Sequence, residues 1–378
     1  MEVMAPLFTE AFGNAASHTH AYGWRAEAVV ELAREELASA LGAGEPREIV
    51  FTSGATESNN LALLGAAQAS GKDSPHVVTV ATEHPSVLDP CEALRRSGAR
   101  VTVLPVDDQG LVDPEAVAAA IGDDTVVVSV MAANNEIGVL QPLAEIGALC
   151  RERGVLFHSD AAQALGKVPL SVDPMGLDLV SVSGHKVYGP KGVGLLYVRR
   201  RKGGRRVRLA PQIHGGGHEH GLRSGTLPVP LIAGLAKAVE LALEDREEEA
   251  ARLVKLRERL LEGLLGVVPG ALLNGHPTRR LPANLNLAFP GAPADALLPA
   301  LPDLALSSGS ACSSARPEPS HVLIALGLDE KRVACSLRIG LGRGTTEACV
   351  DRAAERIAEE VASLRAGRAP ADPEGPVR

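Results

Sequence analysis

The chain has 378 residues, of which 45% are hydrophobic and 22% charged, values typical of a folded protein large enough for two domains. A net charge of −8 and an aromatic content of 2% argue against direct nucleic-acid binding by charge attraction or base stacking. No apolar stretch is long enough to span a membrane, and no secretory signal pattern precedes the first helix. Five cysteines without Cys-x-x-Cys spacing disfavour a disulfide framework and a metal site, and they favour a reducing cytoplasm.

The order of hydrophobic patterns along the chain predicts an α/β fold. Helical spacing of apolar residues predicts a helix over residues 25–40, and strand-like runs then alternate with helical stretches as far as residue 200. Such alternation predicts a mostly parallel seven-stranded sheet with helices on both faces. The predicted strands are residues 48–52, 76–81, 100–105, 125–131, 155–159, 177–183 and 193–198.

The second half of the chain predicts a smaller domain. Residues 228–266 follow the pattern of one long or kinked helix, which links a large domain (1–245) to a C-terminal α+β domain (246–364). Residues 365–378 are Pro-rich and predicted to be disordered. The basic run at residues 199–206 is interpreted as a solvated turn between strands rather than a docking patch for a partner.

Two polar residues at predicted strand ends suggest a cofactor. Asp160 follows the strand over residues 155–159, and Lys186 follows the strand over residues 177–183. In open α/β sheets, ligands bind beyond the carboxyl ends of the strands. An aspartate and a lysine there form the protein half of a pyridoxal phosphate site, in which the lysine makes a Schiff base and the carboxylate holds the pyridine nitrogen protonated.

Three further strand ends carry polar groups. Gly54 opens a helix whose free N–H groups, with the Thr56 hydroxyl, suit a phosphate, although a simple N-cap is the alternative. His84 could stack on a pyridine ring or shuttle a proton, and a structural histidine is the alternative. The third strand end is at residues 132–136, which follow the predicted strand over residues 125–131 and include Asn135. Five successive strands therefore end in groups suited to one ligand.

These residues resemble the motifs of the cysteine desulfurases, which are fold-type I pyridoxal phosphate enzymes of the class V aminotransferase group. The resemblance covers about residues 5–364, and the Ser/Gly-rich loop around Cys312 is similar to the long-loop branch that serves iron–sulfur assembly. The motifs are Gly-Ala-Thr-Glu-Ser-Asn-Asn (54–60), Thr-Glu-His (82–84), Asn-Asn-Glu-Ile-Gly (134–138), His-Ser-Asp-Ala-Ala-Gln (158–163), Ser-Gly-His-Lys (183–186), Gly-Gly-Gly-His-Glu (215–219), Arg-Ser-Gly-Thr (223–226), Ser-Ser-Gly-Ser-Ala-Cys (307–312) and Ser-Leu-Arg-Ile-Gly (336–340).

The resemblance implies a role for each matching residue in cofactor binding. Lys186 forms the Schiff base and moves the Cα proton, and His84 stacks on the ring. Asp160 pairs with the pyridinium, and Gln163 bonds the ring hydroxyl. The phosphate is held by hydroxyl and imidazole groups, with one hydroxyl supplied by the neighbouring subunit: Thr56, Ser183 and His185, and Thr226 of the second chain.

It also implies the groups that handle the substrate, L-cysteine. Asn135 and Arg338 bind the substrate carboxylate, and Asn135 also belongs to the cofactor-binding set. A structural ion pair is the alternative for Arg338. Cys312 is the nucleophile that takes sulfur as a persulfide, and its serine- and glycine-rich surroundings cannot form a packed core, which favours an exposed thiol. The other four cysteines are expected to be small buried hydrophobic residues: Cys91, Cys150, Cys335 and Cys349.

The expected protein is a cytoplasmic homodimer that passes sulfur to an iron–sulfur scaffold protein or a tRNA-thiolation enzyme, with transient cluster ligation by Cys312. A second hypothesis is that the protein is a selenocysteine lyase, because the same site would accept selenium in place of sulfur. A third is a catalytically impaired partner protein: family members usually begin with an Asn-Ala-Ala-Thr-Thr-Pro segment, and Met1 aligns just downstream of it. A smaller departure is His220, where the family more often has Arg or Gln.

Overall fold

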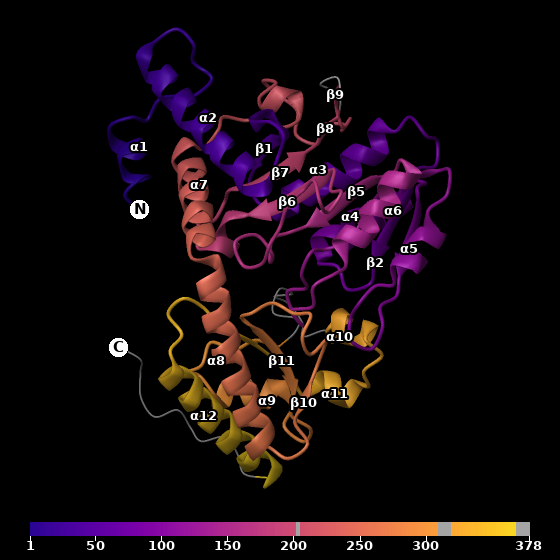
Figure 1. Ribbon diagram of the computed structural model, residues 1–378, viewed down its shortest axis with the longest axis vertical. Coiled ribbons are helices and arrows are strands. Elements are labelled where there is room, and N and C mark those ends of the chain that lie inside the picture. Colours follow the sequence, from indigo (N-terminus) through magenta and orange to yellow (C-terminus); the bar gives the residue numbers. More distant parts are fainter. Residues whose placement is uncertain (202–204, 309–318, 368–378) are drawn as a thin grey trace. The chain divides into compact units, whose positions relative to one another are not determined.

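The computed structural model describes residues 1–201, 205–308 and 319–367 (Figure 1). The chain forms two compact units. The first comprises Met1–Leu104, Val112–Ala133 and Gln141–Arg246, and the second Pro105–Leu111, Asn134–Leu140 and Glu247–Arg378. The domain limits 1–245 and 246–364 stay a prediction. Within the range predicted for the large domain, the two short segments 105–111 and 134–140 belong to the second unit. Most of the predicted disordered tail lies outside the described residues.

A seven-stranded sheet forms the centre of the first unit, with strand order β1-β7-β6-β5-β4-β2-β3. Only β7 runs antiparallel to its neighbours β1 and β6, and the other pairs are parallel, so the predicted mostly parallel sheet is confirmed. The strands are β1 (Ile49–Thr52), β2 (His76–Val80), β3 (Arg100–Leu104), β4 (Thr125–Ser129), β5 (Leu156–Asp160), β6 (Leu179–Ser183) and β7 (Gly194–Val198).

Burial explains why these segments are strands. Every residue of β2, β6 and β7 is buried, as expected for Val- and Leu-rich strands that helices cover on both faces. Helices α2 and α7 pack along each other (Figure 1), while α3 contacts α4 and the strands β1, β2, β4, β5, β6 and β7. The helices of this unit are α1 (Ala5–Thr9), α2 (Ala21–Leu41), α3 (Ala55–Ala69), α4 (Pro85–Arg96), α5 (Pro114–Ala120), α6 (Leu143–Arg153) and α7 (Val229–Glu244), with short 3-10 turns at η1 (Pro46–Glu48), η2 (Gly184–Val187) and η3 (Glu219–Gly221).

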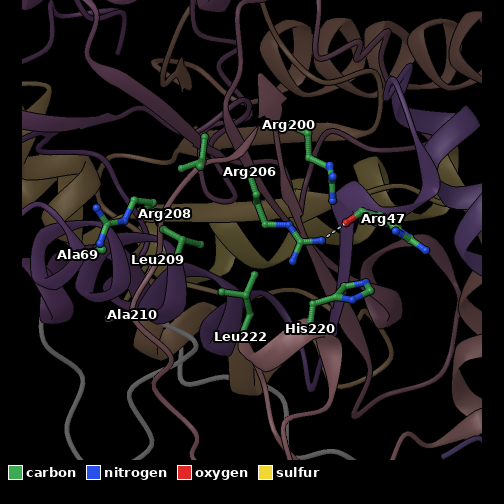
Figure 2. A pocket seen from close by; sticks show the side chains of 10 residues that line it. Arg47, Ala69, Arg200, Arg206, Arg208, Leu209, Ala210, His220 and Leu222 are labelled. Atoms are coloured by element: carbon green, nitrogen blue, oxygen red, sulfur yellow. Dashed lines mark hydrogen bonds between the residues drawn. The ribbon is translucent and has the colours of Figure 1, made fainter. Parts of the chain in front are cut away.

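The structure refines two details of the sequence interpretation. The long or kinked helix predicted for residues 228–266 is interrupted at Asp245, since α7 ends at Glu244 and α8 (Arg246–Val267) begins at the next residue. The basic run is not simply a solvated turn, since it forms a short ladder of β8 (Arg200–Arg201) and β9 (Arg205–Arg206), and Arg199 pairs with Asp173 at 2.6 Å. Arg200 and Arg206 instead line a cavity of about 540 Å³ together with His220 (Figure 2).

The second unit is built on an antiparallel sheet in the order β10-β11-β12. Leucines of α8, β11 and β12, with branched residues of α12, form its apolar core. Its remaining elements are β10 (Leu272–Leu273), β11 (Asn284–Ala288), α9 (Ala294–Ala300), α10 (His321–Ala325), α11 (Glu330–Ala334), β12 (Ser336–Gly340) and α12 (Glu347–Arg365). Across the described part of the chain, no helix has the length and apolarity needed to cross a membrane.

A buried ion pair holds the Gly-rich segment of residues 215–219 against the sheet of the first unit. The Glu219 carboxylate accepts bonds from the Arg34 guanidinium at 2.8 and 3.0 Å and from the Phe51 backbone N–H at 2.7 Å. Arg34 also donates to the Ile49 carbonyl at 2.6 Å. Glu219 and His220 both have positive φ angles, 51° and 57°, so this turn costs backbone strain that the buried contacts offset.

Loss of the buried partner is therefore expected to be costly. Glu219→Ala should lower the free energy of unfolding by about 3–5 kcal/mol, because the Arg34 charge stays buried without a partner. The control is Glu31→Ala, which removes an exposed partner of the same arginine and should cost less than about 1 kcal/mol. Urea unfolding of both variants measures the difference, and equal small losses would contradict this account.

Candidate functional site

The direction of the strands brings the predicted site residues of the first unit to one edge of the sheet. Because β7 lies antiparallel between β1 and β6, β1 points the same way as β6, β5, β4 and β2. Their carboxyl ends therefore share an edge, which is where ligands bind in open α/β sheets. Gly54 after β1 and Ser183 at the end of β6 lie close together, since a Cβ on Gly54 would come within 3.4 Å of the Ser183 hydroxyl.

Asp160 is the last residue of β5 and is 5% exposed. Its two carboxylate oxygens accept bonds from separate donors: Oδ2 from Asn59 Nδ2 at 2.8 Å, and Oδ1 from the Ala162 backbone N–H at 2.9 Å. Asn59 lies on the buried face of α3. The carboxylate is thus held in one orientation by groups that themselves belong to regular structure.

His84 is the N-cap of α4 and contacts the residue two positions later. Its Nδ1 accepts the Ser86 backbone N–H at 3.1 Å and lies 2.8 Å from the Ser86 hydroxyl. Ser86 Oγ in turn lies 2.8 Å from Asn59 Nδ2. A continuous chain of hydrogen bonds therefore links two of the predicted site residues, Asp160 and His84.

Glu83 directly precedes His84 in the chain and is fully buried. Its Oε1 accepts the Met131 backbone N–H at 2.6 Å. Burial and the nearby charge of Asp160 raise the pKa of Glu83 well above its usual value, although the Met131 hydrogen bond opposes the shift. Burial thus favours the uncharged form of Glu83 beside the Asp160 carboxylate.

Lys186 lies in the short turn η2 directly after β6, and its side chain is exposed. The preceding Ser183 hydroxyl bonds His185 Nδ1 at 2.9 Å. Register places Asp160 opposite Ser181 in the parallel β5–β6 pair, so the carboxylate and the lysine belong to adjacent strand ends. The structure therefore gives Asp160 and Lys186 the arrangement expected from the sequence.

The helix α3 begins with features suited to an anion. Its N-cap is Gly54, with φ of 153° and no side-chain cap, so the first backbone N–H groups are not covered by a capping side chain. A residue with a Cβ would strain there and narrow the space beside Ser183. Thr56 lies in the first turn and is exposed. An uncapped helix start with neighbouring hydroxyls is a common phosphate site.

Gln163 has a partner that the sequence did not indicate. Lys167 donates from Nζ to Gln163 Oε1 at 2.8 Å. Because the amide oxygen is used in this way, the Gln163 amide nitrogen remains to donate to other groups. Burial of its amine, together with the charge of Lys186, lowers the pKa of Lys167 to about 8.

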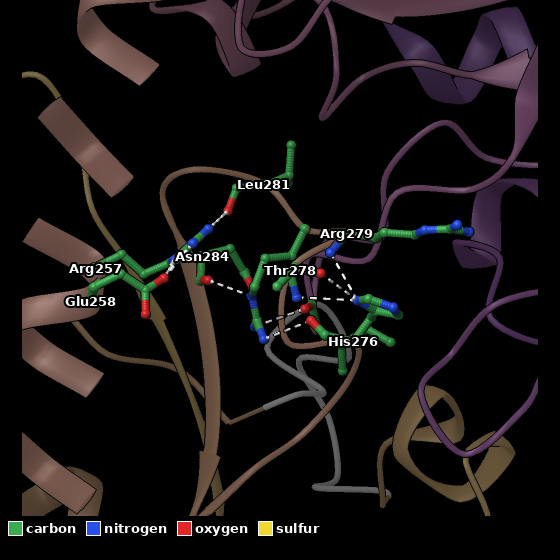
Figure 3. A network of polar contacts seen from close by, with 9 residues as sticks. Arg257, Glu258, His276, Thr278, Arg279, Leu281 and Asn284 are labelled. Carbon is green, nitrogen blue, oxygen red and sulfur yellow. Dashed lines mark hydrogen bonds and ion pairs between the residues drawn. The ribbon is translucent and has the colours of Figure 1, made fainter. Parts of the chain in front are cut away.

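The second unit positions Asn135 and Arg338. Arg338 donates to the Asn135 carbonyl at 3.3 Å, and the Asn135 loop is fixed further by Arg280, which is 4% exposed and donates to the Ile137 carbonyl at 3.0 Å. Asn284 donates to the Glu136 carbonyl. Figure 3 shows the surrounding network, in which Arg257 bonds the Leu281 carbonyl and His276 Nδ1 accepts the Arg279 N–H. The loop is therefore well anchored.

Other site predictions are not tested by these contacts. Thr226 is exposed, and Cys312 lies outside the described residues. Cys91, Cys150 and Cys335 are buried, as expected, and burial raises the pKa of both Cys91 and Cys150 to about 12. The prediction for Cys349 was wrong: its thiol is exposed in the first turn of α12, and hydrogen bonds from Thr346 lower its pKa.

The sequence interpretation missed Asn59, Ser86 and Lys167. Asn59 had a usable signal, because it lies at helical spacing among the buried positions of α3, where a polar residue needs a partner. Ser86 follows a Pro in the first turn of a helix and looks like an ordinary capping residue. Lys167 offered no signal, since its partner depends on how the turn after β5 folds.

The lowered pKa of Lys167 predicts a specific pH dependence. Between pH 8 and 10.5 the folded lysine has lost its proton while the unfolded lysine keeps it, so this group makes stability rise with pH. Lys167→Met lacks that rise. Its free energy of unfolding relative to the parent should therefore fall by about 1–3 kcal/mol between pH 7 and pH 10. Urea unfolding tests this, with exposed Lys191→Met as the control; a flat difference for Lys167→Met would contradict the burial.

Comparison with known proteins agrees with this geometry. A family model described as aminotransferase class-V matches residues 1–353. The cysteine desulfurase IscS of Anaeromyxobacter dehalogenans is 53% identical over 368 residues, 97% of this chain and 89% of the relative. A solved NifS-like protein superposes with a TM-score of 0.87 at 38% identity, covering 96% of this chain and 94% of the other.

A second solved structure, of SspA in complex with cysteine, has a TM-score of 0.78 at 38% identity and covers 90% of this chain and 94% of the other. The family match spans most of the chain, and the relative matches at about half of the positions over nearly the full length. The chain belongs to the class-V aminotransferase family and, within it, to the cysteine desulfurases.

Proposed function

We propose that this cysteine desulfurase holds pyridoxal phosphate at the carboxyl edge of the seven-stranded sheet, takes sulfur from L-cysteine and carries it on Cys312 as a persulfide. The observation that carries the proposal is the buried Asp160 carboxylate, which ends β5 beside the strand leading to Lys186. A carboxylate held by two N–H donors is suited to pair with a protonated pyridine nitrogen. The cysteine complex of SspA supports L-cysteine as the substrate.

The residues present fit this cofactor. The uncapped start of α3 and the hydroxyls of Thr56 and Ser183 suit a phosphate, with His185 beside them and Thr226 supplied by a second subunit. Gln163 has its amide oxygen engaged by Lys167, so its nitrogen suits the ring oxygen. These groups can therefore donate hydrogen bonds to the phosphate oxygens and to the ring oxygen of the cofactor.

The catalytic roles follow from the same residues. When bound, the cofactor supplies an electron sink that acidifies the Cα proton of the substrate and weakens its C–S bond. Lys186 would hold the cofactor through Nζ and would move the Cα proton. His84 would stack on the ring, orient it and shield it from water. In the second unit, Asn135 and Arg338 bind the substrate carboxylate, for which a guanidinium fork is well shaped.

Sulfur transfer requires a thiolate. The Cys312 thiolate forms an S–S bond to the substrate sulfur as the Cβ–S bond breaks, and the bonding pair stays with the carbon skeleton. Protons from solvent and Lys186 complete that skeleton as alanine. The products are therefore alanine and a Cys312 persulfide, with no external oxidant or reductant. Cys91 and Cys150 are unsuited to this step, because burial raises their pKa values to about 12.

The persulfide is proposed to pass to an iron–sulfur scaffold protein or a tRNA-thiolation enzyme, with transient ligation of a cluster by Cys312. A cytoplasmic location belongs to the same proposal. Its support is that four cysteines of the described chain are free thiols, as a reducing compartment requires.

A homodimer is also proposed. The chain has nine aromatic residues, and four of them are exposed within the first 24 positions: Phe8, Phe12, Tyr22 and Trp24. Large apolar side chains exposed together in this way suit a surface that a second copy of the chain covers. A two-fold interface would allow Thr226 of one subunit to serve the phosphate site of the other.

The first experiment compares the proposed sulfur carrier, Cys312, with Cys349, whose thiol is exposed. Cys312→Ser should lose alanine formation from cysteine by about two orders of magnitude or more, because a hydroxyl is a poor sulfur acceptor at neutral pH. Its bound cofactor and colour should remain. Cys349→Ser removes a thiol that is exposed in the described part of the chain and should keep the parent rate. A Cys312→Ser protein that forms alanine and a persulfide at the parent rate would exclude Cys312 as the carrier.

The second experiment tests the shared phosphate site. Lys186→Ala removes the reacting amine, and Thr226→Ala weakens the neighbouring site. A heterodimer of the two has one doubly damaged site and one intact site. Random exchange should therefore restore roughly a quarter of the parent activity, since half of the dimers are heterodimers and half of their sites are intact. Verified heterodimers without any gain would place Thr226 in its own subunit's site.

A further inference from the structure

Asn59 connects two groups that flank the proposed cofactor ring. Both hydrogens of its amide are used, one on Asp160 Oδ2 and one on Ser86 Oγ, each at 2.8 Å. Asn59 is fully buried in α3, Asp160 ends β5, and Ser86 lies in α4. One side chain thus ties three elements together directly beneath the edge of the sheet.

The amide can take only one of its two orientations. Exchanging its oxygen and nitrogen would set Oδ1 against the Asp160 carboxylate, lone pair to lone pair. In the observed orientation, Asn59 Oδ1 has no hydrogen-bond partner among the described residues. A buried amide oxygen without a hydrogen-bond partner lowers the stability of the fold. The role of Asn59 therefore lies in the two hydrogen bonds that its amide nitrogen donates.

The same chain fixes the hydrogen on His84. The Ser86 backbone N–H donates to His84 Nδ1 at 3.1 Å, and a backbone N–H cannot accept. Nδ1 must therefore present its lone pair. Because Ser86 Oγ already accepts from Asn59, its hydroxyl hydrogen is directed to the same Nδ1 at 2.8 Å. The neutral ring consequently carries its hydrogen on Nε2.

We propose that Asn59 is a positioning residue that holds the Asp160 carboxylate and, through Ser86, locks His84 in the Nε2–H tautomer. This inference rests on the proposed cofactor site. It gives His84 a restricted role. Nδ1 accepts from two donors and Nε2 already carries hydrogen, so neutral His84 can stack and donate a hydrogen bond, whereas a proton added at Nδ1 would cost both accepted bonds. Moving the Cα proton is then left to Lys186.

The tautomer is measured directly in the holoenzyme. Long-range ¹H–¹⁵N correlation spectra of deuterated, ¹⁵N-histidine-labelled protein separate a bare nitrogen from one that carries hydrogen, and His84→Gln identifies the resonance. The expected result is a bare Nδ1 and a protonated Nε2 for His84 near neutral pH. A hydrogen on Nδ1, whether in the other tautomer or in an imidazolium, would overturn the proposal. A parent protein that binds no cofactor would instead contradict the proposed function.

The role of Asn59 is tested by Asn59→Leu, which keeps the volume and removes both donors. Cofactor affinity should fall roughly tenfold or more, since a hydrogen bond to a charged group is lost. The His84 Nδ1 resonance should move, because the Ser86 hydroxyl is no longer directed. Asn60→Leu is the matched control: its amide donates to the Thr56 carbonyl within the same helix, and both readouts should stay at parent values.

A second, smaller substitution keeps the proposal testable if Asn59→Leu fails to fold. Ser86→Ala removes the hydroxyl link but leaves the backbone N–H and the Asn59–Asp160 bond in place. It should shift the His84 Nδ1 resonance while cofactor affinity stays within about twofold of the parent, because the Asp160 contact is untouched. An unchanged resonance in Ser86→Ala, or parent-like affinity in a folded Asn59→Leu, would show that the chain of bonds has no positioning role.

Discussion

The position of β7 decides where the groups of the first unit meet. It lies antiparallel between β1 and β6, so β1 and β6 point the same way, and the loop after β1 leaves the sheet at the same edge as Asp160 and Lys186. The backbone of β7 at Gly194 lies very close to β6 and to the loop after β1. A Cβ on Gly194 would lie 2.3 Å from the Val182 carbonyl and 2.6 Å from Gly54 Cα. Glycine at the start of β7 therefore permits the uncapped start of α3 to lie beside Ser183.

Burial favours the uncharged forms of several polar groups near this edge. The Asp160 carboxylate accepts two hydrogen bonds, whereas burial and the charge of Asp160 raise the pKa of its neighbour Glu83 well above its usual value. His158 is fully buried between two serine hydroxyls, and burial lowers its pKa to about 3, so it is neutral. The Asp160 carboxylate at this edge would be balanced by a protonated ring nitrogen.

Much of the fold could be predicted from the sequence, because the strands are near-continuous apolar runs that end within two residues of their predicted limits. The same runs correctly predicted that Asp160 and Lys186 lie at the ends of strands of one sheet. Partners that depend on packing between elements could not be predicted. Asn59 meets Ser86 only because α3 and α4 lie together, and Lys167 meets Gln163 only because of the turn after β5. Cys349 was misjudged, because exposure at a helix start does not follow from residue type.

The position of a segment in the sequence also did not predict the compact unit to which it belongs. Residues 105–111 and 134–140 follow β3 and β4 of the first unit, yet their contacts belong to the second. For the Asn135 loop the physical reason is visible: Arg280 is buried, its pKa is lowered to about 10 by that burial, and its hydrogens are satisfied by backbone carbonyls, including that of Ile137. The loop therefore supplies acceptors that a buried guanidinium of the second unit needs. Asn135 is in this way held beside Arg338 by forces that no strand-end pattern encodes.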